Sequence, residues 1–163
     1  MVFYLVKHPE TMRNVEDKLT GWEESEYSKL GRVQFEKIVN YFSDNDSVVY
    51  SSDLSRAKML AEKIVGNNDS ELILDVDLRE LNFKETAPHD SCETFDDLDR
   101  RVVNFLKGVT SDAIIVSHAG TTNAIVENLC GKASLNNVRH LPRDVILRIE
   151  NVKNENKLSI IQI

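Results

Sequence analysis

Residues 113–131 read AIIVSHAGTTNAIVENLCG, a short apolar run followed at once by a segment with helical spacing. The run Ala113–Val116 is rich in β-branched residues and is bounded by polar ones, a pattern typical of a buried strand. The segment from Gly120 to Leu129 carries one apolar helix face, and Gly131 stands where a helix would end. Because the helix follows the strand directly, this stretch predicts one unit of a parallel α/β sheet.

The rest of the chain alternates strand-like and helix-like segments in the same way. Further short apolar runs occur at Val2–Val6, Val48–Tyr50, Leu72–Leu74, Val145–Ile149 and Leu158–Ile163. The i, i+3, i+4, i+7 spacing of amphipathic helices occurs at Phe35–Phe42, Ala57–Ile64 and Val102–Val109. Asp53 stands where an N-cap residue would precede the second of these helices. The pattern predicts a single α/β domain over residues 1–163, with helices packed against a mainly parallel sheet.

Composition excludes several classes of protein. With 41% apolar and 29% charged residues, the 163-residue chain has the make-up of a globular domain and not of a disordered or coiled-coil protein. Its formal charge of −7 argues against nucleic acid or an anionic membrane as the main partner. No apolar run approaches the ~20 residues of a membrane helix, and no cleavable leader opens the chain, so we expect a cytoplasmic protein. Cys92 and Cys130 lack the Cys/His spacing of a metal site, so a structural zinc has no obvious ligands.

Charged residues and histidines follow three of the predicted strands. Lys7 and His8 come directly after the first strand, Arg56 comes a few residues after the second, and His118 follows Ala113–Val116. Ligands of parallel sheets bind outside the carboxyl ends of the strands, so we expect these side chains to converge at one edge. The N-termini of the helices that begin there attract anions. The sequence therefore predicts a site for a phosphate-like ligand.

These residue types suit phosphoryl transfer, which needs a nucleophile, positive charge around the phosphoryl oxygens, and an acid for the leaving oxygen. A neutral imidazole can attack phosphorus to give a phosphohistidine, while the other imidazole, Lys7 and Arg56 stabilise the developing charge. Glu80 follows the third predicted strand and is our candidate for the acid. No metal ion is required by this chemistry.

The same residues resemble the motifs of the histidine phosphatase superfamily, the group that includes phosphoglycerate mutase. The family carries Arg-His-Gly-Glu-Thr after its first strand, where this chain has Lys7 to Thr11, and Asn14 stands at the spacing of the family's asparagine. Val116–Gly120 is similar to the family's Val-Ser-His-Gly-Gly. The other similar blocks are Gly21-Trp22, Leu30-Gly31 with Gln34, Ser51–Ala57, Leu78–Phe83, and Glu93-Thr94 with Arg101.

The resemblance implies a three-layer α/β/α sandwich with a mainly parallel central sheet, and a phosphatase that hydrolyses phosphomonoesters through a phosphohistidine on one histidine. It implies a small phosphorylated molecule or inorganic phosphate as the ligand, and no cofactor. The implied catalytic residues are His8, Glu80 and His118, and the implied phosphate-binding residues are Lys7, Asn14, Arg56 and Ala119.

Three residues depart from the family pattern. Lys7 replaces a planar guanidinium by a point charge, so a bidentate grip on two phosphate oxygens is lost. Pro9 replaces glycine, which removes an N–H and fixes φ near −65°. Ala119 replaces glycine and adds a Cβ beside the expected ligand. The departures suggest a third possibility besides a phosphatase or a phosphoglycerate mutase-type phosphoryl transferase, namely a catalytically weakened anion-binding or regulatory member of the family.

Two stretches without clear periodicity, Pro9–Ser28 and Asn82–Glu93, are predicted to be functional loops. Only 12 residues separate Glu80 from Glu93, fewer than in typical mutases, so we expect a reduced lid over the substrate. This short insertion favours the phosphatase over the mutase. Glu80 is the least constrained assignment, because short phosphohistidine phosphatases of the superfamily work without this acid.

Overall fold

The computed structural model describes residues 1–68, 70–83, 85–86, 91–152 and 154–163, which form a six-stranded sheet in the order β3-β2-β4-β1-β5-β6. The strands are β1 (Val2–Lys7), β2 (Val48–Ser51), β3 (Leu72–Leu74), β4 (Ala113–Ser117), β5 (Val145–Val152) and β6 (Glu155–Gln162). β1 to β4 are parallel to one another, whereas β5 pairs antiparallel with β1 and β6 pairs antiparallel with β5. The sheet is thus mixed but mainly parallel, as the sequence predicts.

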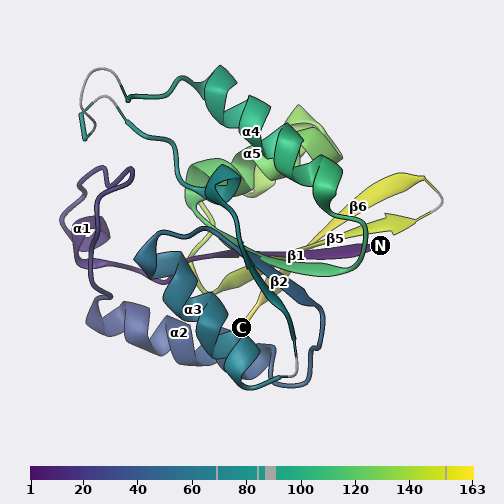
Figure 1. Ribbon diagram of the computed structural model, residues 1–163, viewed down its shortest axis with the longest axis horizontal. Coiled ribbons are helices and arrows are strands. Elements are labelled where there is room, and N and C mark those ends of the chain that lie inside the picture. The colour runs from purple at the N-terminus through teal and green to yellow at the C-terminus, as the bar shows by residue number, and fades with distance from the viewer. Residues whose placement is uncertain (69, 84, 87–90, 153) are drawn as a thin grey trace.

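Helices cover both faces of this sheet (Figure 1). The α-helices are α1 (Met12–Val15), α2 (Lys29–Tyr41), α3 (Ser55–Gly66), α4 (Phe95–Gly108) and α5 (Ala119–Cys130), and the short 3₁₀ helices are η1 (Val76–Leu78) and η2 (Lys132–Asn137). α2 and α3 pack on one face, and α4 and α5 pack on the other. This arrangement confirms the predicted three-layer sandwich. Within the described residues, every helix is too short or too polar to cross a bilayer.

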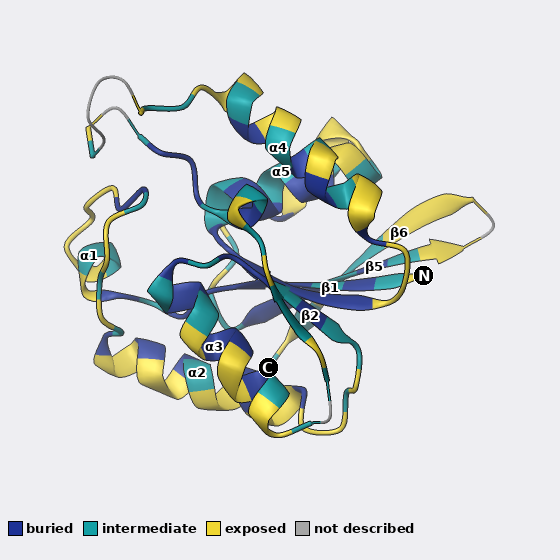
Figure 2. Ribbon diagram, viewed as in Figure 1, coloured by how far each residue is buried: buried dark blue, intermediate teal, exposed yellow. Residues whose placement is uncertain are grey.

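Two apolar cores lie on opposite sides of the sheet. Leu60 and Ile64 of α3 belong to one core, and Val102 and Phe105 of α4 belong to the other. Side chains on β1 alternate between the two, because successive strand residues point to opposite faces. Figure 2 shows the consequence on α2, α3 and α4, which carry buried residues toward the sheet and exposed residues on the outer side. The amphipathic spacing read from the sequence therefore marks the faces that hold the three layers together.

The predicted N-cap at Asp53 is wrong. α3 begins at Ser55, and its N-cap residue Leu54 makes no side-chain cap. The Asp53 carboxylate instead accepts hydrogen bonds from Nε and Nη2 of Arg79 at 2.7 and 2.6 Å. Two charge-assisted bonds to a guanidinium hold it more strongly than one helix N–H would. By contrast, α5 ends as predicted at Gly131, whose φ of 80° favours glycine.

The parallel strands bring several chain segments to one edge of the sheet. The segment after β1 contains the predicted loop Pro9–Ser28, which includes α1 and is closed by a bridge between Thr11 and Tyr27. The second predicted loop, Asn82–Glu93, lies partly outside the described residues. Its two described ends are joined, since the Glu93 N–H donates to the Asn82 carbonyl and the Asn82 N–H donates to Glu93 Oε2, both at 2.9 Å.

Candidate active site

His8, the predicted nucleophile, lies directly after β1 and is only 4% exposed. Its backbone N–H donates to the Ser117 carbonyl at 2.9 Å, which continues the pairing of β1 with β4. Its ring Nδ1 lies 2.7 Å from the carbonyl oxygen of Pro9. Because a carbonyl can only accept, Nδ1 carries the ring proton and Nε2 presents its lone pair. The carbonyl of residue 9 is the group that orients His8, and proline retains this group.

His118 stands at the junction of β4 and α5 and faces the first histidine. The centroids of the His8 and His118 rings are 5.1 Å apart. The Nε2 atom of His118 lies 2.9 Å from the Ser52 hydroxyl, whereas its buried Nδ1 has no hydrogen-bond partner among the described residues. When the Ser52 hydroxyl donates to Nε2, Nδ1 carries a proton and can donate to a ligand.

Arg56 lies in the first turn of α3 and is 1% exposed. Its Nε atom donates to Nε2 of His8 at 3.3 Å. Nη1 and Nη2 donate to the carbonyls of Glu23 and Gly21 at 2.9 and 2.7 Å. Burial lowers the pKa of the guanidinium to about 10, an effect that the Glu80 and Glu24 carboxylates oppose. Arg56 thus joins the 21–23 turn to the predicted nucleophile.

Lys7 lies next to His8 in sequence, but its described side-chain contact is with the backbone and not with either ring. Its Nζ atom donates to the Leu141 carbonyl at 2.5 Å. Burial, followed by the positive charge of Arg143, lowers the pKa of Lys7 to about 8.

Arg143 also belongs to the cluster, and no signal in the sequence singles it out. Its Nη1 atom donates to the His8 carbonyl at 2.9 Å and to His8 Nε2 at 3.1 Å. The residue precedes β5, which pairs antiparallel with β1 so that Val6 lies opposite Ile146. Continuing this register brings residue 143 beside the segment that follows β1. Only the pairing of β1 with β5 reveals this contact, because 135 residues separate the two side chains in sequence.

Glu80 is a buried residue whose carboxylate lies against the first turn of α5. Its Oε2 accepts from the Gly120 N–H at 3.2 Å and its Oε1 accepts from the Leu81 N–H at 2.9 Å. A Cβ at position 120 would lie 2.4 Å from Oε1, so a side chain at this position would displace the carboxylate from the start of the helix. The charge of Glu80 raises the pKa of both Arg56 and Arg143, against the larger effect of burial.

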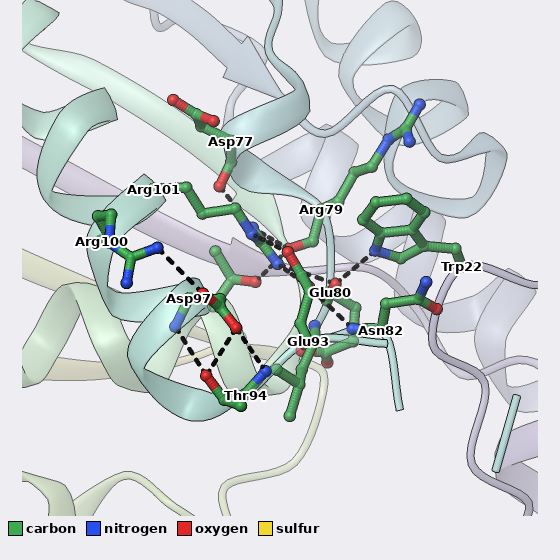
Figure 3. A network of polar contacts seen from close by, with 12 residues as sticks. Trp22, Asp77, Arg79, Glu80, Asn82, Glu93, Thr94, Asp97, Arg100 and Arg101 are labelled. Carbon is green, nitrogen blue, oxygen red and sulfur yellow. Dashed lines mark hydrogen bonds and ion pairs between the residues drawn. The ribbon is translucent and has the colours of Figure 1, made fainter. Parts of the chain in front are cut away.

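A network around Arg101 holds the backbone that carries this carboxylate (Figure 3). Arg101 forms an ion pair with Glu93 at 2.9 Å and donates to the carbonyls of Asp77, Arg79 and Glu80. Trp22 Nε1 also donates to the Glu80 carbonyl, at 2.7 Å. The Glu93 and Arg101 side chains, which the sequence pattern singles out, thus hold the backbone turn that carries Glu80.

The remaining predicted site residues, Asn14 and Ala119, have no described side-chain contact with the two histidines. The Asn14 Oδ1 atom accepts from the N–H and the hydroxyl of Thr11, both at 3.0 Å, and so caps the short helix α1. Among the described contacts, Asn14 therefore serves its own turn and not the histidines. Ala119 is the first residue of α5 and follows His118 directly.

Within the described part of the chain, the cations of this cluster form no direct ion pairs, although carboxylates including Glu80 act on Arg56 and Arg143 from a distance. Lys7, Arg56 and Arg143 form no ion pair with any carboxylate among the described residues. Desolvated cations without a partner are costly, and an anion placed among them would recover that cost. The part of the chain that the structure describes holds no group of three or more metal-ligating side chains. The arrangement suits a phosphate-like anion.

Both buried histidines should make stability fall in mild acid. Burial, followed by nearby arginine charge, lowers the pKa of His8 and His118 well below 6.5. Below about pH 6.5 the unfolded chain then binds more protons than the folded one. The free energy of unfolding therefore falls as the pH is lowered, by up to about 1.4 kcal/mol per pH unit for each ring. Urea unfolding between about pH 7 and about pH 5 measures this slope. The double variant His8→Asn/His118→Asn should show a smaller dependence of the unfolding free energy on pH than the natural protein. The control variant His140→Ala, at an exposed histidine, should show the same dependence as the natural protein.

Comparison with known proteins agrees with this geometry. The sequence profile of the histidine phosphatase superfamily (branch 1) matches residues 3–90. The "Putative phosphoserine phosphatase 2" of Hydrogenobacter thermophilus is 28% identical over an alignment covering 78% of each chain. The alpha-ribazole phosphatase of Shigella flexneri has the same fold, with TM-score 0.83 and 18% identity over 99% of this chain and 96% of that chain. A mycobacterial glucosyl-3-phosphoglycerate phosphatase in complex with VO3 has TM-score 0.81 and 19% identity over 98% and 97%.

The matched segment makes up more than half of the chain. It includes the carboxyl end of β1 with His8, the turn with Arg56 and the turn with Glu80. The fold of the whole chain agrees, including the part beyond residue 90 that supplies His118. The chain therefore belongs to branch 1 of the histidine phosphatase superfamily, a class of phosphomonoesterases with the phosphoglycerate mutase-like fold.

Proposed function

We propose that the protein is a phosphatase that hydrolyses a small phosphomonoester through a phosphohistidine on His8, without a metal ion. The observation that supports this most directly is the state of the His8 ring. Its Nδ1 proton is held by the Pro9 carbonyl, and Nε2 is left as a buried lone pair among cations without carboxylate partners. A neutral nucleophile beside positive charge is what attack on an anionic phosphoryl group requires.

In the first step, the Nε2 lone pair of His8 forms a bond to phosphorus as the bond from phosphorus to the alcohol oxygen breaks. Glu80, in its protonated form, gives its proton to that leaving oxygen. The charge that develops on the phosphoryl oxygens is stabilised by Arg56 and by Nδ1–H of His118, which is buried and has no other partner among the described residues.

In the second step, a water molecule attacks phosphorus and the phosphorus–nitrogen bond breaks. The water proton goes to the Glu80 carboxylate, and His8 returns to its neutral state. The sum of the two steps is a phosphomonoester plus water giving an alcohol plus inorganic phosphate, with His8 and Glu80 restored. Arg56 serves in both steps because its guanidinium is anchored by the 21–23 turn.

The relatives support a proposal for the substrate class. Proteins similar to this one are named for phosphoserine, alpha-ribazole phosphate and glucosyl-3-phosphoglycerate, which are small phosphorylated molecules. We therefore propose a small phosphorylated metabolite as the substrate and inorganic phosphate as the product. Hydrolysis is favoured over transfer to a second alcohol because only 12 residues separate Glu80 from Glu93, and from this length we expect a reduced lid against water.

The proposal is tested by release of inorganic phosphate from p-nitrophenyl phosphate and from a panel of metabolite phosphates, with a metal chelator present throughout. We expect turnover that the chelator does not reduce, and inhibition by vanadate. Protein quenched in alkali during turnover should carry phosphate that acid removes, as expected of a phosphoramidate bond. Release that requires an added divalent metal would contradict the mechanism. Tight phosphate binding with no turnover of any substrate would favour an anion-binding protein instead.

A further inference from the structure

The cation nearest to the nucleophile in sequence makes no described contact with the His8 ring. Lys7 directs its ammonium to the Leu141 carbonyl, and its pKa of about 8 makes the neutral amine a substantial fraction near that pH. An ammonium is also a point charge, which cannot bind two phosphoryl oxygens with two parallel N–H groups. Another residue must therefore supply a planar cation on this side of His8.

Arg56 contributes positive charge to the transferring group, but its described contacts leave it little freedom to bind two phosphoryl oxygens with parallel N–H groups. Its Nη1 and Nη2 atoms are held by the carbonyls of Glu23 and Gly21, and its Nε faces His8 Nε2. Arg143 approaches the same Nε2 more closely, at 3.1 Å, and only its Nη1 is engaged in the hydrogen bonds of the described residues. Its Nε and Nη2 groups are therefore available to a ligand that reaches the ring.

Arg143 also lies outside the regular elements of the fold. Residues 138–144 between η2 and β5 form no helix or strand, and Arg143 is half-buried where Arg56 is fully buried. Its guanidinium lies against the lone pair that must meet phosphorus. An incoming phosphoryl group would replace that contact with stronger, charge-assisted bonds to its own oxygens.

We propose that Arg143 binds the transferring phosphoryl group, its guanidinium passing from His8 Nε2 to two phosphoryl oxygens when phosphorus approaches that nitrogen. The role rests on the proposed function at His8 and makes Arg143 a catalytic residue, in contact with the reacting nitrogen atom. Arg143 then supplies the planar cation that position 7 lacks.

The neighbourhood of positions 7 and 143 allows this role to be moved between them. Lys7 Nζ binds Leu141, two residues before Arg143, and the charge of Arg143 lowers the pKa of Lys7. An arginine at position 7 would place a guanidinium in the same part of the site. In an Arg143→Ala protein, the second change Lys7→Arg should therefore restore part of what the first removes.

The experiment compares the natural protein with Arg143→Ala, Arg143→Lys, Arg143→Ala/Lys7→Arg and the control Arg139→Ala, an exposed arginine of the same loop. Two quantities are measured: kcat/KM for phosphate release, and the Kd for inorganic phosphate and vanadate. We expect Arg143→Ala to lower kcat/KM by roughly 10²–10³-fold, as for loss of one preorganised donor to the transferring group. The same change should weaken the binding of both phosphate and vanadate. Arg143→Lys should retain only part of the kcat/KM that Arg143→Ala loses. The double variant Arg143→Ala/Lys7→Arg should have a kcat/KM at least tenfold above that of Arg143→Ala. Arg139→Ala should match the natural protein.

Thermal unfolding midpoints show whether each variant is folded at the assay temperature. If Arg143→Ala is unstable, the comparison of Arg143→Lys with the natural protein decides the question, because lysine retains the charge and most of the stem. Equal affinity of folded Arg143 variants and the natural protein for phosphate and vanadate would overturn the inference. If the natural protein binds phosphate but turns over nothing, the proposed function fails, and a loss of binding in Arg143→Ala would still support this role.

Discussion

Replacing His8 by asparagine is expected to abolish phosphate release, with kcat reduced by roughly 10⁴–10⁶-fold, as for loss of a covalent nucleophile. Asparagine can place its amide N–H near the position of Nδ1, where it donates to the Pro9 carbonyl, but it has no counterpart of Nε2. The variant therefore keeps the contact that orients residue 8 and loses the nitrogen that would bind phosphorus. The measurement is phosphate release with the natural protein and the variant at equal concentration.

The matched control is His140→Ala, which removes an exposed histidine that makes no described contact with the site. This control should retain the natural rate. His8→Asn should still bind phosphate, because Arg56, His118 and Arg143 remain. Turnover by His8→Asn above a tenth of the natural rate would mean that another group attacks phosphorus, and the phosphohistidine mechanism would be wrong.

Gly31→Ala is expected to cost about 3 kcal/mol of folding stability, the upper end for an overpacked site that cannot relax locally. Gly31 lies in the first turn of α2, where a Cβ would come 1.9 Å from the carbonyl oxygen of Glu10. That contact is with backbone, so no rotamer change can relieve it. The Glu10 backbone is held by hydrogen bonds on both sides, from its N–H to Gln34 Oε1 and from the Ser28 N–H to its carbonyl.

The strain should also reach the active site, because Glu10 lies two residues after His8. We expect Gly31→Ala to lower both the urea midpoint and kcat. The control is Gly66→Ala at the end of α3, where nothing lies within 4 Å of an added Cβ. This change should stabilise the protein by about 0.5–1 kcal/mol, because alanine favours helix more than glycine. Equal midpoints for the two variants would show that α2 does not press on the segment after β1.

The departure at position 9 has a physical explanation in the structure. Proline lacks an N–H, yet the group used at this position is a carbonyl, and no positive φ occurs there. The departure at position 7 is different, since the Lys7 ammonium is committed to Leu141. This contrast is why we place the compensating cation at Arg143 and retain a catalytic role for the site.

Periodicity was sufficient to predict the layers of the fold. The helix spacing at Ala57–Ile64 lies within α3, and the run Ala113–Val116 lies within β4, because both segments bury a continuous face and this requires a regular apolar pattern. The N-cap at Asp53 could not be predicted correctly, because its preferred partner Arg79 lies 26 residues away in sequence. Predictions from local propensity use only residues that are close in sequence, so they do not include a contact with a distant guanidinium.

The candidate site divides in the same way. His8, Arg56, Glu80 and His118 follow from sequence alone, because parallel strands deliver their carboxyl ends to one edge whatever the register between them. Three features required the tertiary structure: the direction of Lys7, the capping role of Asn14 and the presence of Arg143. Each depends on which atoms meet across strand β5 or within one turn, and on burial that removes water from the charges. The sequence by itself therefore determined the chemistry available at this edge, and tertiary packing decided which cations face the nucleophile.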